Sequence, residues 1–319
     1  MDTDDALDLA YEPAPDPHTP DTFHLTLPHG IRLSCRAAGA VDAPQRVLLL
    51  HGFPEAAFVW DEVIAALAPQ ARCLAPNLRG YEHSSAPAAV EAYRAKHLVA
   101  DLVALIEHLG APIDVLVAHD WGGGVAWNLA ALRPELVRQL VIVNSPHPGA
   151  LLRELRDNPA QQAASDYMHE LIQPQAASRL AANDFALLFD KLSRFGQARW
   201  LTPALRQRYR AVWACGLDGA LNYYRASPLR PPSAADASIH TLQLPPSVVN
   251  VSVPTRMLWG EADQALLPCL LDGLEQWVPQ LQVERVPGAS HWIVHEEPAR
   301  VVETICQALA DAQAATVGR

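Results

Sequence analysis

The sequence predicts an α/β fold: a mostly parallel, doubly wound sheet with a helical cap inserted after the sixth strand. Short apolar runs rich in β-branched residues recur along the chain and are typical of strands buried on both faces. Segments with apolar residues at helical spacing alternate with these runs, as expected for a parallel sheet. The stretch from 150 to 247 breaks this rhythm, because it holds helical patterns and no convincing buried strand.

The 319 residues suit about two domains, or one large domain with an insertion. Residues 1–22 are acidic and proline-rich, with too little apolar surface to offset the entropy of ordering, so we expect a loose tail. We expect the sheet domain to have a first part at 23–149 and a second part at 248–319. The helical cap would then occupy 150–247.

The first part of the sheet domain begins with alternating apolar residues on either side of a turn from Pro28 to Gly30, which predicts a β-hairpin. The helix expected at 95–109 carries leucines at helical spacing and ends at Gly110. The elements expected before residue 110 are strand 23–27, strand 31–35, strand 46–50, helix 59–67, strand 72–75 and helix 95–109.

A buried-type strand at 115–118 then runs into Asp120, and a glycine cluster opens a helix expected at 125–132. A strand that passes directly into a helix needs a sharp turn, and the small residues Ala118 and Gly122 leave room for one. This is the G-x-S-x-G elbow pattern, with Asp120 in the place of serine and Ala118 in the place of the first glycine. Such an elbow holds its central side chain beside a helix N-terminus, which stabilises negative charge.

An aspartate at this position favours attack on a saturated carbon that carries a leaving group. That attack forms an ester, which water can later cleave, whereas attack on an ester carbonyl would form an anhydride and gain little. The alternative is that Asp120 only caps the helix, since aspartate is a preferred N-cap residue. The elbow alone leaves both interpretations open.

After the elbow we expect a further buried strand at 139–143, followed by the cap, whose helical patterns are broken at prolines. The sheet pattern then resumes. The elements expected there are strand 255–259, a helix near 266–277, strand 281–286 and a helix at 298–312.

Two of these later strand ends supply candidates for a base and its partner, which an ester on Asp120 would need for its hydrolysis. Glu261 and Asp263 follow one predicted strand, and His291 follows the next. The chain has 13 histidines, so His291 alone is weak support. Asp120, Asp263 and His291 do follow the order nucleophile, acid, histidine that accompanies such an elbow.

An oxyanion would be stabilised by backbone N–H groups. We expect one from Trp121, directly after the nucleophile, and one from Phe53 in the His-Gly-Phe-Pro turn at 51–54. We interpret His119 and His295 as core or surface histidines. The side chains expected to contact substrate are His51, Pro54, Trp121, His147 and Trp292.

Five motifs carry a resemblance to a known family: His-Gly-Phe-Pro at 51–54, Asn-Leu-Arg-Gly-Tyr at 77–81, His-Asp-Trp-Gly-Gly at 119–123, Gly-Glu-Ala-Asp at 260–263 and His-Trp-x-x-His-Glu-Glu-Pro at 291–298. With them the chain resembles the α/β-hydrolase family, specifically its epoxide hydrolase branch, over about residues 23 to 312. The resemblance implies that Asp120 is the nucleophile, His291 the base and Asp263 its partner, under a cap at the carboxyl ends of the strands. One departure is Glu82, where the family usually has glycine.

An epoxide oxygen leaves as a basic alkoxide and needs an acid, a task suited to a phenol with a pKa of about 10. The Asn-Tyr-Tyr-Arg segment at 222–225 resembles the Asn-x-Tyr-Arg segment of epoxide hydrolases and indicates Tyr224. The Ser-Asp-Tyr segment at 165–167 likewise indicates Tyr167. The alternative for both is amphipathic packing. The resemblance predicts an enzyme that opens an epoxide to a vicinal diol.

The main alternative is a haloalkane dehalogenase with the same three residues, because the Trp121 indole N–H could bind a halide. Phe53 stands where haloalkane dehalogenases often have asparagine, and Trp121 and Gly124 stand where haloacetate dehalogenases have arginines, so a haloacid substrate is disfavoured. A non-catalytic binding protein on this scaffold is the other class. A serine-type esterase is disfavoured by Asp120.

Composition limits the partners. A formal net charge of −11 argues against nucleic acid and anionic membranes, and no apolar run reaches the ~18 residues of a membrane span. The acidic start and five scattered cysteines predict a reduced protein of the cytoplasm. We expect a small-molecule epoxide and water as partners, with no cofactor and no metal ion. The sequence leaves open whether the chain forms a homodimer.

Overall fold

The computed structural model describes residues 20–194 and 198–317. At its centre lies an eight-stranded sheet in the order β1-β2-β4-β3-β5-β6-β7-β8. β1 pairs antiparallel with β2, and β2 with β4, while all later neighbours pair parallel. The strands are β1 (Asp21–Thr26), β2 (Arg32–Ala38), β3 (Arg46–Leu50), β4 (Arg72–Pro76), β5 (Ile113–His119), β6 (Val137–Val143), β7 (Thr255–Gly260) and β8 (Leu281–Val286).

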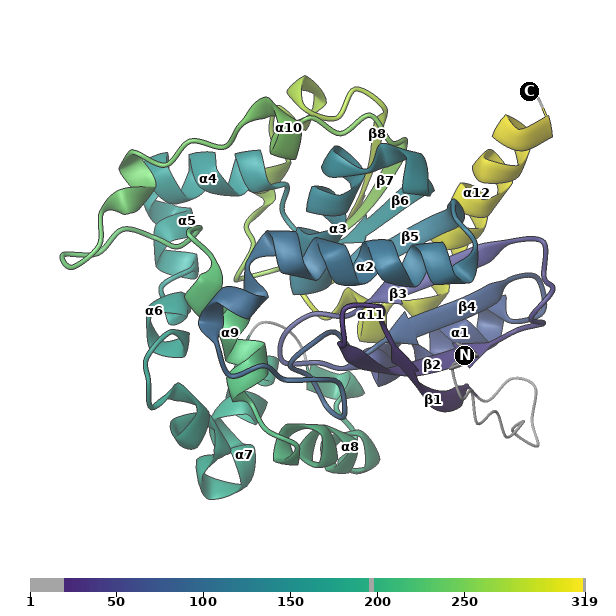
Figure 1. The fold of residues 1–319 in the computed structure, drawn as a ribbon. Coiled ribbons are helices and arrows are strands. Elements are labelled where there is room, and N and C mark those ends of the chain that lie inside the picture. Colours follow the sequence, from purple (N-terminus) through teal and green to yellow (C-terminus); the bar gives the residue numbers. More distant parts are fainter. Residues whose placement is uncertain (1–19, 195–197, 318–319) are drawn as a thin grey trace, which may run out of the picture.

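Helices cover both faces of the sheet, which is why its central strands are apolar along their length. α2 and α3 lie together on one face, and α1 and α12 pack together on the other (Figure 1). α2 ends at Gly110, whose φ of 87° lies in the left-handed region that glycine adopts without strain. The helices of the sheet domain are α1 (Asp61–Leu67), α2 (Ala95–Leu109), α3 (Trp121–Leu132), α11 (Ile293–Glu296) and α12 (Pro298–Val317), with short 3₁₀ helices at Ala57–Trp60, Val90–Tyr93 and Pro134–Leu136.

Between β6 and β7 the described residues form helices and no strand. Four of these helices begin with proline, whose missing N–H costs nothing in the first turn. α5 to α9 gather at one end of the sheet (Figure 1). The helices are α4 (Pro148–Asp157), α5 (Pro159–Ala164), α6 (Tyr167–Leu171), α7 (Ala176–Arg194, interrupted at 182–185), α8 (Pro203–Ala214), α9 (Asp218–Ala226) and α10 (Pro246–Val249), with short 3₁₀ helices at Ala198–Trp200 and Ser238–His240.

Hydrogen bonds fix this helical segment over the carboxyl ends of the parallel strands. The Trp213 indole N–H on α8 donates to the Pro54 carbonyl oxygen at 2.6 Å. The Tyr223 hydroxyl on α9 donates to the Arg79 carbonyl oxygen at 3.0 Å. Both acceptors lie in loops that directly follow strands β3 and β4, so the helices close over the loops where a site would form.

Two predicted elements differ from the structure. The helix expected at 125–132 begins at Trp121, because the turn is completed within the single residue Asp120 and the glycines form the first helical turn. The helix expected near 266–277 is replaced by two 3₁₀ helices, Pro268–Leu271 and Leu274–Gln276, separated by Gly273 with a φ of 68°. The expected tail at 1–22 lies outside the described residues except for its last three, two of which belong to β1.

Candidate active site

Asp120 occupies the turn between β5 and α3. Its φ of 48° and ψ of −122° form a strained conformation for a residue other than glycine. A Cβ on Gly122 would lie 2.6 Å from the His51 carbonyl oxygen, so the neighbouring strand leaves space for glycine alone. The Ser145 hydroxyl donates a 2.7 Å hydrogen bond to the Asp120 carbonyl oxygen. These contacts hold the Asp120 carboxylate at the carboxyl end of the sheet.

The imidazole of His291 lies between two carboxylates. Its Nδ1 lies 2.7 Å from Oδ2 of Asp263, to which it donates, and its Nε2 lies 3.6 Å from Oδ2 of Asp120. Asp263 also accepts a 2.8 Å hydrogen bond from the Asn144 side chain and two from backbone N–H groups of the loop that follows it. The fixed Asp263 carboxylate therefore orients the imidazole so that Nε2 faces Asp120.

The charges around His291 determine its protonation. Burial by itself would lower its pKa, but Asp263, through its charge and its hydrogen bond, and the charges of Asp120 and Glu55 raise the pKa to about 9. His291 therefore carries a proton at neutral pH. Esterification of Asp120 would remove one of these negative charges, and the imidazole would then give up its proton more readily.

The two oxygens of Asp120 have different neighbours. The backbone N–H of Phe53 donates a 2.7 Å hydrogen bond to Oδ1. Oδ2 faces His291. The backbone N–H of Trp121 is the first of α3 and follows Asp120 directly. Of the two predicted N–H donors, that of Phe53 is hydrogen-bonded to the carboxylate, and that of Trp121 belongs to the residue directly after Asp120.

Tyr167 on α6 and Tyr224 on α9 reach the same space from the helical segment. Their ring centroids lie 6.3 Å apart, and Tyr224 packs edge-on against Phe53 and Trp121 at 5.3 and 5.0 Å. Burial, above all, raises the pKa of both phenols, and the charge of Asp120 adds to this effect. Both hydroxyl groups therefore keep their protons at neutral pH and can donate hydrogen bonds.

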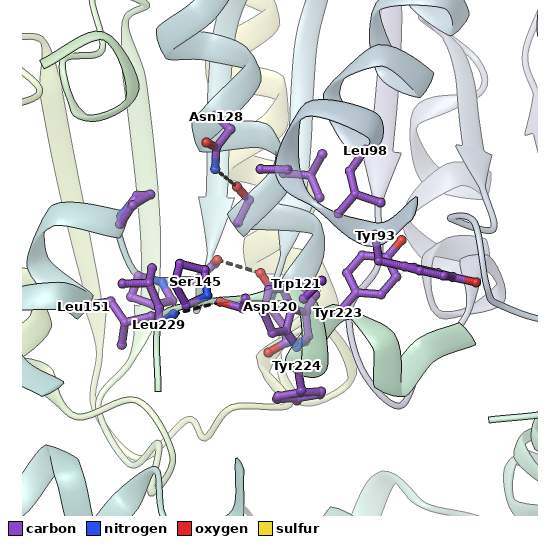
Figure 2. A pocket seen from close by; sticks show the side chains of 18 of the residues that line it. Tyr93, Leu98, Asp120, Trp121, Asn128, Ser145, Leu151, Tyr223, Tyr224 and Leu229 are labelled. Carbon is purple, nitrogen blue, oxygen red and sulfur yellow. Dashed lines mark hydrogen bonds between the residues drawn. The ribbon is translucent and has the colours of Figure 1, made fainter. Parts of the chain in front are cut away.

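Two cavities meet at Asp120. The larger, of about 210 Å³, is mainly apolar; Figure 2 shows Trp121, Tyr224 and Leu151 around the carboxylate. The smaller, of about 30 Å³, lies on the side of His291 and has room for a water molecule. The side chains that line both cavities are Asp120, Tyr167 and Tyr224, and the smaller cavity is also lined by Phe53, Pro54, His291 and Trp292.

His51 and His147 are placed differently from the prediction that they contact substrate. The Nε2 of His51 accepts a 3.1 Å hydrogen bond from the Leu78 N–H. The Nδ1 of His147 accepts from the Gly149 N–H at 3.1 Å, and its Nε2 donates to a backbone carbonyl at 2.8 Å. Among the described residues neither histidine lines the two cavities around Asp120. The ring nitrogens of both side chains are hydrogen-bonded to loop backbone, so these histidines stabilise loops.

The sequence did not single out Glu55, although it follows the His-Gly-Phe-Pro motif directly. Its buried carboxylate has Oε1 2.8 Å from both the Tyr209 hydroxyl and Nε2 of His295, and Oε2 3.2 Å from Nδ1 of His119. Nε2 of His119 lies 2.8 Å from the His291 carbonyl oxygen and must donate to it.

The sequence did hold a signal for this network. Glu55 is an acidic residue shortly after one strand, and His119 is a histidine at the end of the neighbouring strand. His119 and His295 are core or surface histidines, as expected, but neither stands alone: His119 contacts the His291 carbonyl oxygen, and His295 contacts the Glu55 carboxylate. Burial would raise the pKa of Glu55, but hydrogen bonds from His119 and His295 lower it overall, so this carboxylate is ionised.

The backbone conformation at Glu82 is one that glycine adopts without strain, which accounts for the expectation of glycine at this position. Its φ of 47° lies in the left-handed region, which costs least for glycine. Its carboxylate accepts a hydrogen bond from the Asn77 side chain, and the Asn77 side-chain oxygen accepts from the Ala57 N–H at 2.7 Å. The hydrogen bond of the glutamate thus stabilises the loop after β4, which offsets the free-energy cost of its backbone conformation.

Within the ranges 20–194 and 198–317, no group of three or more His, Cys, Asp or Glu side chains could hold a metal ion. Over the same ranges, no helix combines the length and apolar character that crossing a membrane requires.

Residues 45–298 match the model of the family described as alpha/beta hydrolase fold, and the chain belongs to this family. It is 34% identical over 285 residues to the AB hydrolase superfamily protein YfhM of Bacillus subtilis, an alignment that covers 88% of this chain and 95% of that protein. It is 31% identical over 278 residues to Epoxide hydrolase 4 of Mus musculus, covering 84% of this chain and 74% of that protein.

Solved structures place the chain within the family. The epoxide hydrolase of Bacillus megaterium in complex with an inhibitor superposes with a TM-score of 0.80 at 31% identity, over 90% of this chain and all of that one. An epoxide hydrolase from metagenomes of hot environments gives a TM-score of 0.81 at 32% identity, over 91% of this chain and 98% of that one. The branch is therefore that of the epoxide hydrolases.

Proposed function

We propose that this protein hydrolyses epoxides to vicinal diols through a covalent ester on Asp120. The observation that carries the proposal is the convergence of three groups on one space: the Asp120 carboxylate, the phenols of Tyr167 and Tyr224, and the imidazole of His291. Relatives and structural neighbours that are named epoxide hydrolases support the same reaction.

In the first step the epoxide lies in the larger cavity, and its oxygen accepts hydrogen bonds from Tyr167 and Tyr224. Oδ2 of Asp120 attacks a ring carbon, the ring C–O bond breaks, and the leaving oxygen takes a proton from a tyrosine. The Phe53 N–H holds Oδ1 during the attack, which orients the carboxylate. The products are an ester on Asp120 and an alcohol.

In the second step the ester is hydrolysed. With Asp120 neutral, His291 releases its proton, which restores the tyrosine, and it then accepts a proton from water. The water oxygen attacks the Asp120 carboxyl carbon, and the N–H groups of Phe53 and Trp121 stabilise the oxyanion. The bond from that carbon to Oδ2 breaks, and the diol leaves with the proton from His291. The water oxygen stays in Asp120, and no step uses a cofactor or a metal ion.

We propose that the segment 150–247 is a cap that shapes the substrate cavity, on a sheet domain formed by 23–149 and 248–319. Tyr167 and Tyr224 both come from that segment, which supports the assignment. A cytoplasmic location belongs to the same proposal, because all five cysteines are free thiols, as suits a reducing compartment.

Dehalogenation by the same residues is distinguished by one contact. Trp121 would bind a halide through its indole N–H, but its ring packs edge-on against Tyr224, with the ring centroids 5.0 Å apart. A panel of epoxides and haloalkanes assayed side by side separates the two reactions: we expect diol formation, and halide release at a comparable rate would favour the alternative.

The ester is tested with two substitutions. We expect Asp120→Ala to abolish turnover and His291→Gln to accumulate an adduct on Asp120, because the ester forms but water is not activated. Intact-protein mass spectrometry after mixing with styrene oxide measures the adduct. Normal turnover without an adduct in the His291→Gln variant would refute the mechanism.

The acid role is tested by replacing Tyr167 and Tyr224 together with phenylalanine. Loss of a general acid costs about 100-fold or more, so ester formation should slow by at least that factor while the haloalkane rate stays near zero. Undiminished epoxide opening in the double variant would reject the role of the two phenols.

A further inference from the structure

A second, larger cavity lies within the helical segment, on the far side of Tyr167. Its volume is about 560 Å³, and it is walled by α5, α6 and α7 together with Gln264 of the sheet domain. The small catalytic cavity beside Asp120 and His291 shares three lining residues with it. Those residues are Tyr167, Leu171 and Lys191. The two cavities are therefore neighbours, with these side chains between them.

The two approaches to Asp120 differ in chemistry. The 210 Å³ cavity is lined mainly by apolar side chains, which suits the apolar part of an epoxide. The wall of the cap cavity carries charges of both signs, which suits water and a diol, since polar groups lose free energy where they find no partners. The charged residues of that wall are Asp166, Glu170, Arg179, Asp190 and Lys191.

Lys191 is the part of this boundary that can move. Leu171 is fully buried and Tyr167 packs against Tyr224, whereas Lys191 has a long flexible stem. Its ammonium lies 5.8 Å from the centre of the Tyr167 ring and 3.5 Å from the Glu170 carboxylate. The Glu170 side chain is 58% exposed, and an ion pair with such a partner contributes little free energy, so it opens readily.

We propose that the cap cavity is a polar passage that supplies water to the catalytic site and releases the diol, and that Lys191 closes it. The epoxide would enter through the apolar cavity, so substrate and product take different routes. This inference rests on the proposed epoxide hydrolysis.

The test follows the individual steps of the reaction in the full-length chain, with styrene oxide as the probe. Ala163→Trp and Leu187→Trp each place an indole in the cap cavity, from α5 and from α7, and neither residue lines the cavities around Asp120. Rapid quenching with intact-mass analysis gives the rate of ester formation, and steady-state assays give turnover. We expect ester formation within about twofold of the unsubstituted protein and turnover lower by at least about threefold, because a later step becomes limiting.

Two outcomes overturn the passage. An equal fall in ester formation and turnover would make the cap cavity the substrate entrance, and no change in either rate would make it a blind cavity. Thermal unfolding identifies a variant that does not fold, in which case the other tryptophan variant decides. Failure of the proposed function looks different, because no ester would then form in the unsubstituted protein.

The role of Lys191 has its own readout. Lys191→Ala removes the closing side chain, so the exchange rate of added diol, measured from NMR line shapes, should rise at least about threefold. Lys96 is the one other lysine in the sequence and is exposed at the start of α2, which makes Lys96→Ala the matched control with an unchanged rate. An unchanged exchange rate in Lys191→Ala would overturn the assignment of Lys191.

Discussion

At the scale of single residues, the two carboxylate oxygens of Asp120 have different surroundings, and we infer different roles for them. Oδ1 is bonded to the Phe53 N–H, where an oxyanion would later form, and Oδ2 faces His291 and remains available for attack. The proton on His291 is stabilised by the same negative charges that esterification would reduce. In the proposed mechanism, the change in charge on Asp120 thereby couples the first half of the reaction to the second.

The raised pKa of His291 predicts a pH dependence of stability. Its pKa rises from an ordinary 6.5 to about 9 in the folded protein, so its pairing stabilises fully below about pH 6.5 and is lost as pH rises through about 9. The melting temperature of the unsubstituted protein should therefore fall relative to that of His291→Gln between about pH 7 and pH 10. A difference that stays constant over this range would contradict the ion pairing.

The sequence could predict which strand ends bring these residues together, because the carboxyl ends of parallel strands meet at one edge of a sheet. Asp120, Asp263 and His291 follow strands β5, β7 and β8 and lie together as expected. Glu55 and His147 were beyond such reasoning. A strand end places a side chain near the edge of the sheet, but packing decides whether the side chain turns toward the cavity or toward backbone.

At the scale of elements, the elbow between β5 and α3 brings the start of α3 close to the end of β3, the strand beside β5. The pattern of small residues predicted a sharp turn, but not that a single strained residue would complete it, which starts the helix four residues before the expected position. Likewise, a helix was expected near 266–277, but Pro268 and Gly273 divide that stretch. Both differences come from backbone conformation, which apolar spacing does not encode.

Two glycines of α3 give opposite predictions. Alanine at Gly122 would place its Cβ 2.6 Å from backbone, and we expect a loss of about 1–3 kcal/mol or more in the free energy of unfolding. Alanine at Gly124 would meet only the Trp121 ring at an ordinary 3.7 Å, and we expect a gain of up to about 1 kcal/mol from helix propensity. Urea unfolding measures both, and equal effects would contradict the close approach at Gly122.

At the scale of the whole molecule, the cap and the sheet domain are joined through buried polar groups. The Tyr209 hydroxyl on α8 donates to Glu55, and Glu55 and His119 lead to the carbonyl of His291. The docking of the cap is thus connected to the backbone that carries His291, the proposed base. Such a link depends on tertiary packing between residues 154 positions apart in the chain, which local pattern cannot supply.

Tyr209→Phe tests this connection. It leaves the buried Glu55 carboxylate short of a donor, so we expect about 1–3 kcal/mol of lost stability together with slower hydrolysis of the ester on Asp120. Gln207→Ala on the exposed side of the same helix is the control and should change stability by less than about 0.5 kcal/mol. Thermal unfolding and single-turnover kinetics measure the two effects. Equal behaviour of the two variants would show that the cap docks independently of the site.

In the proposed mechanism, water attacks the carboxyl carbon of Asp120 and not the epoxide. A single turnover with enzyme in excess over styrene oxide in ¹⁸O-water tests it directly, with mass spectrometry of the diol and of the peptide that contains Asp120. The proposed mechanism predicts unlabelled diol and one ¹⁸O atom in the Asp120 carboxylate. Label in the diol after that first turnover, with none in the peptide, would contradict it.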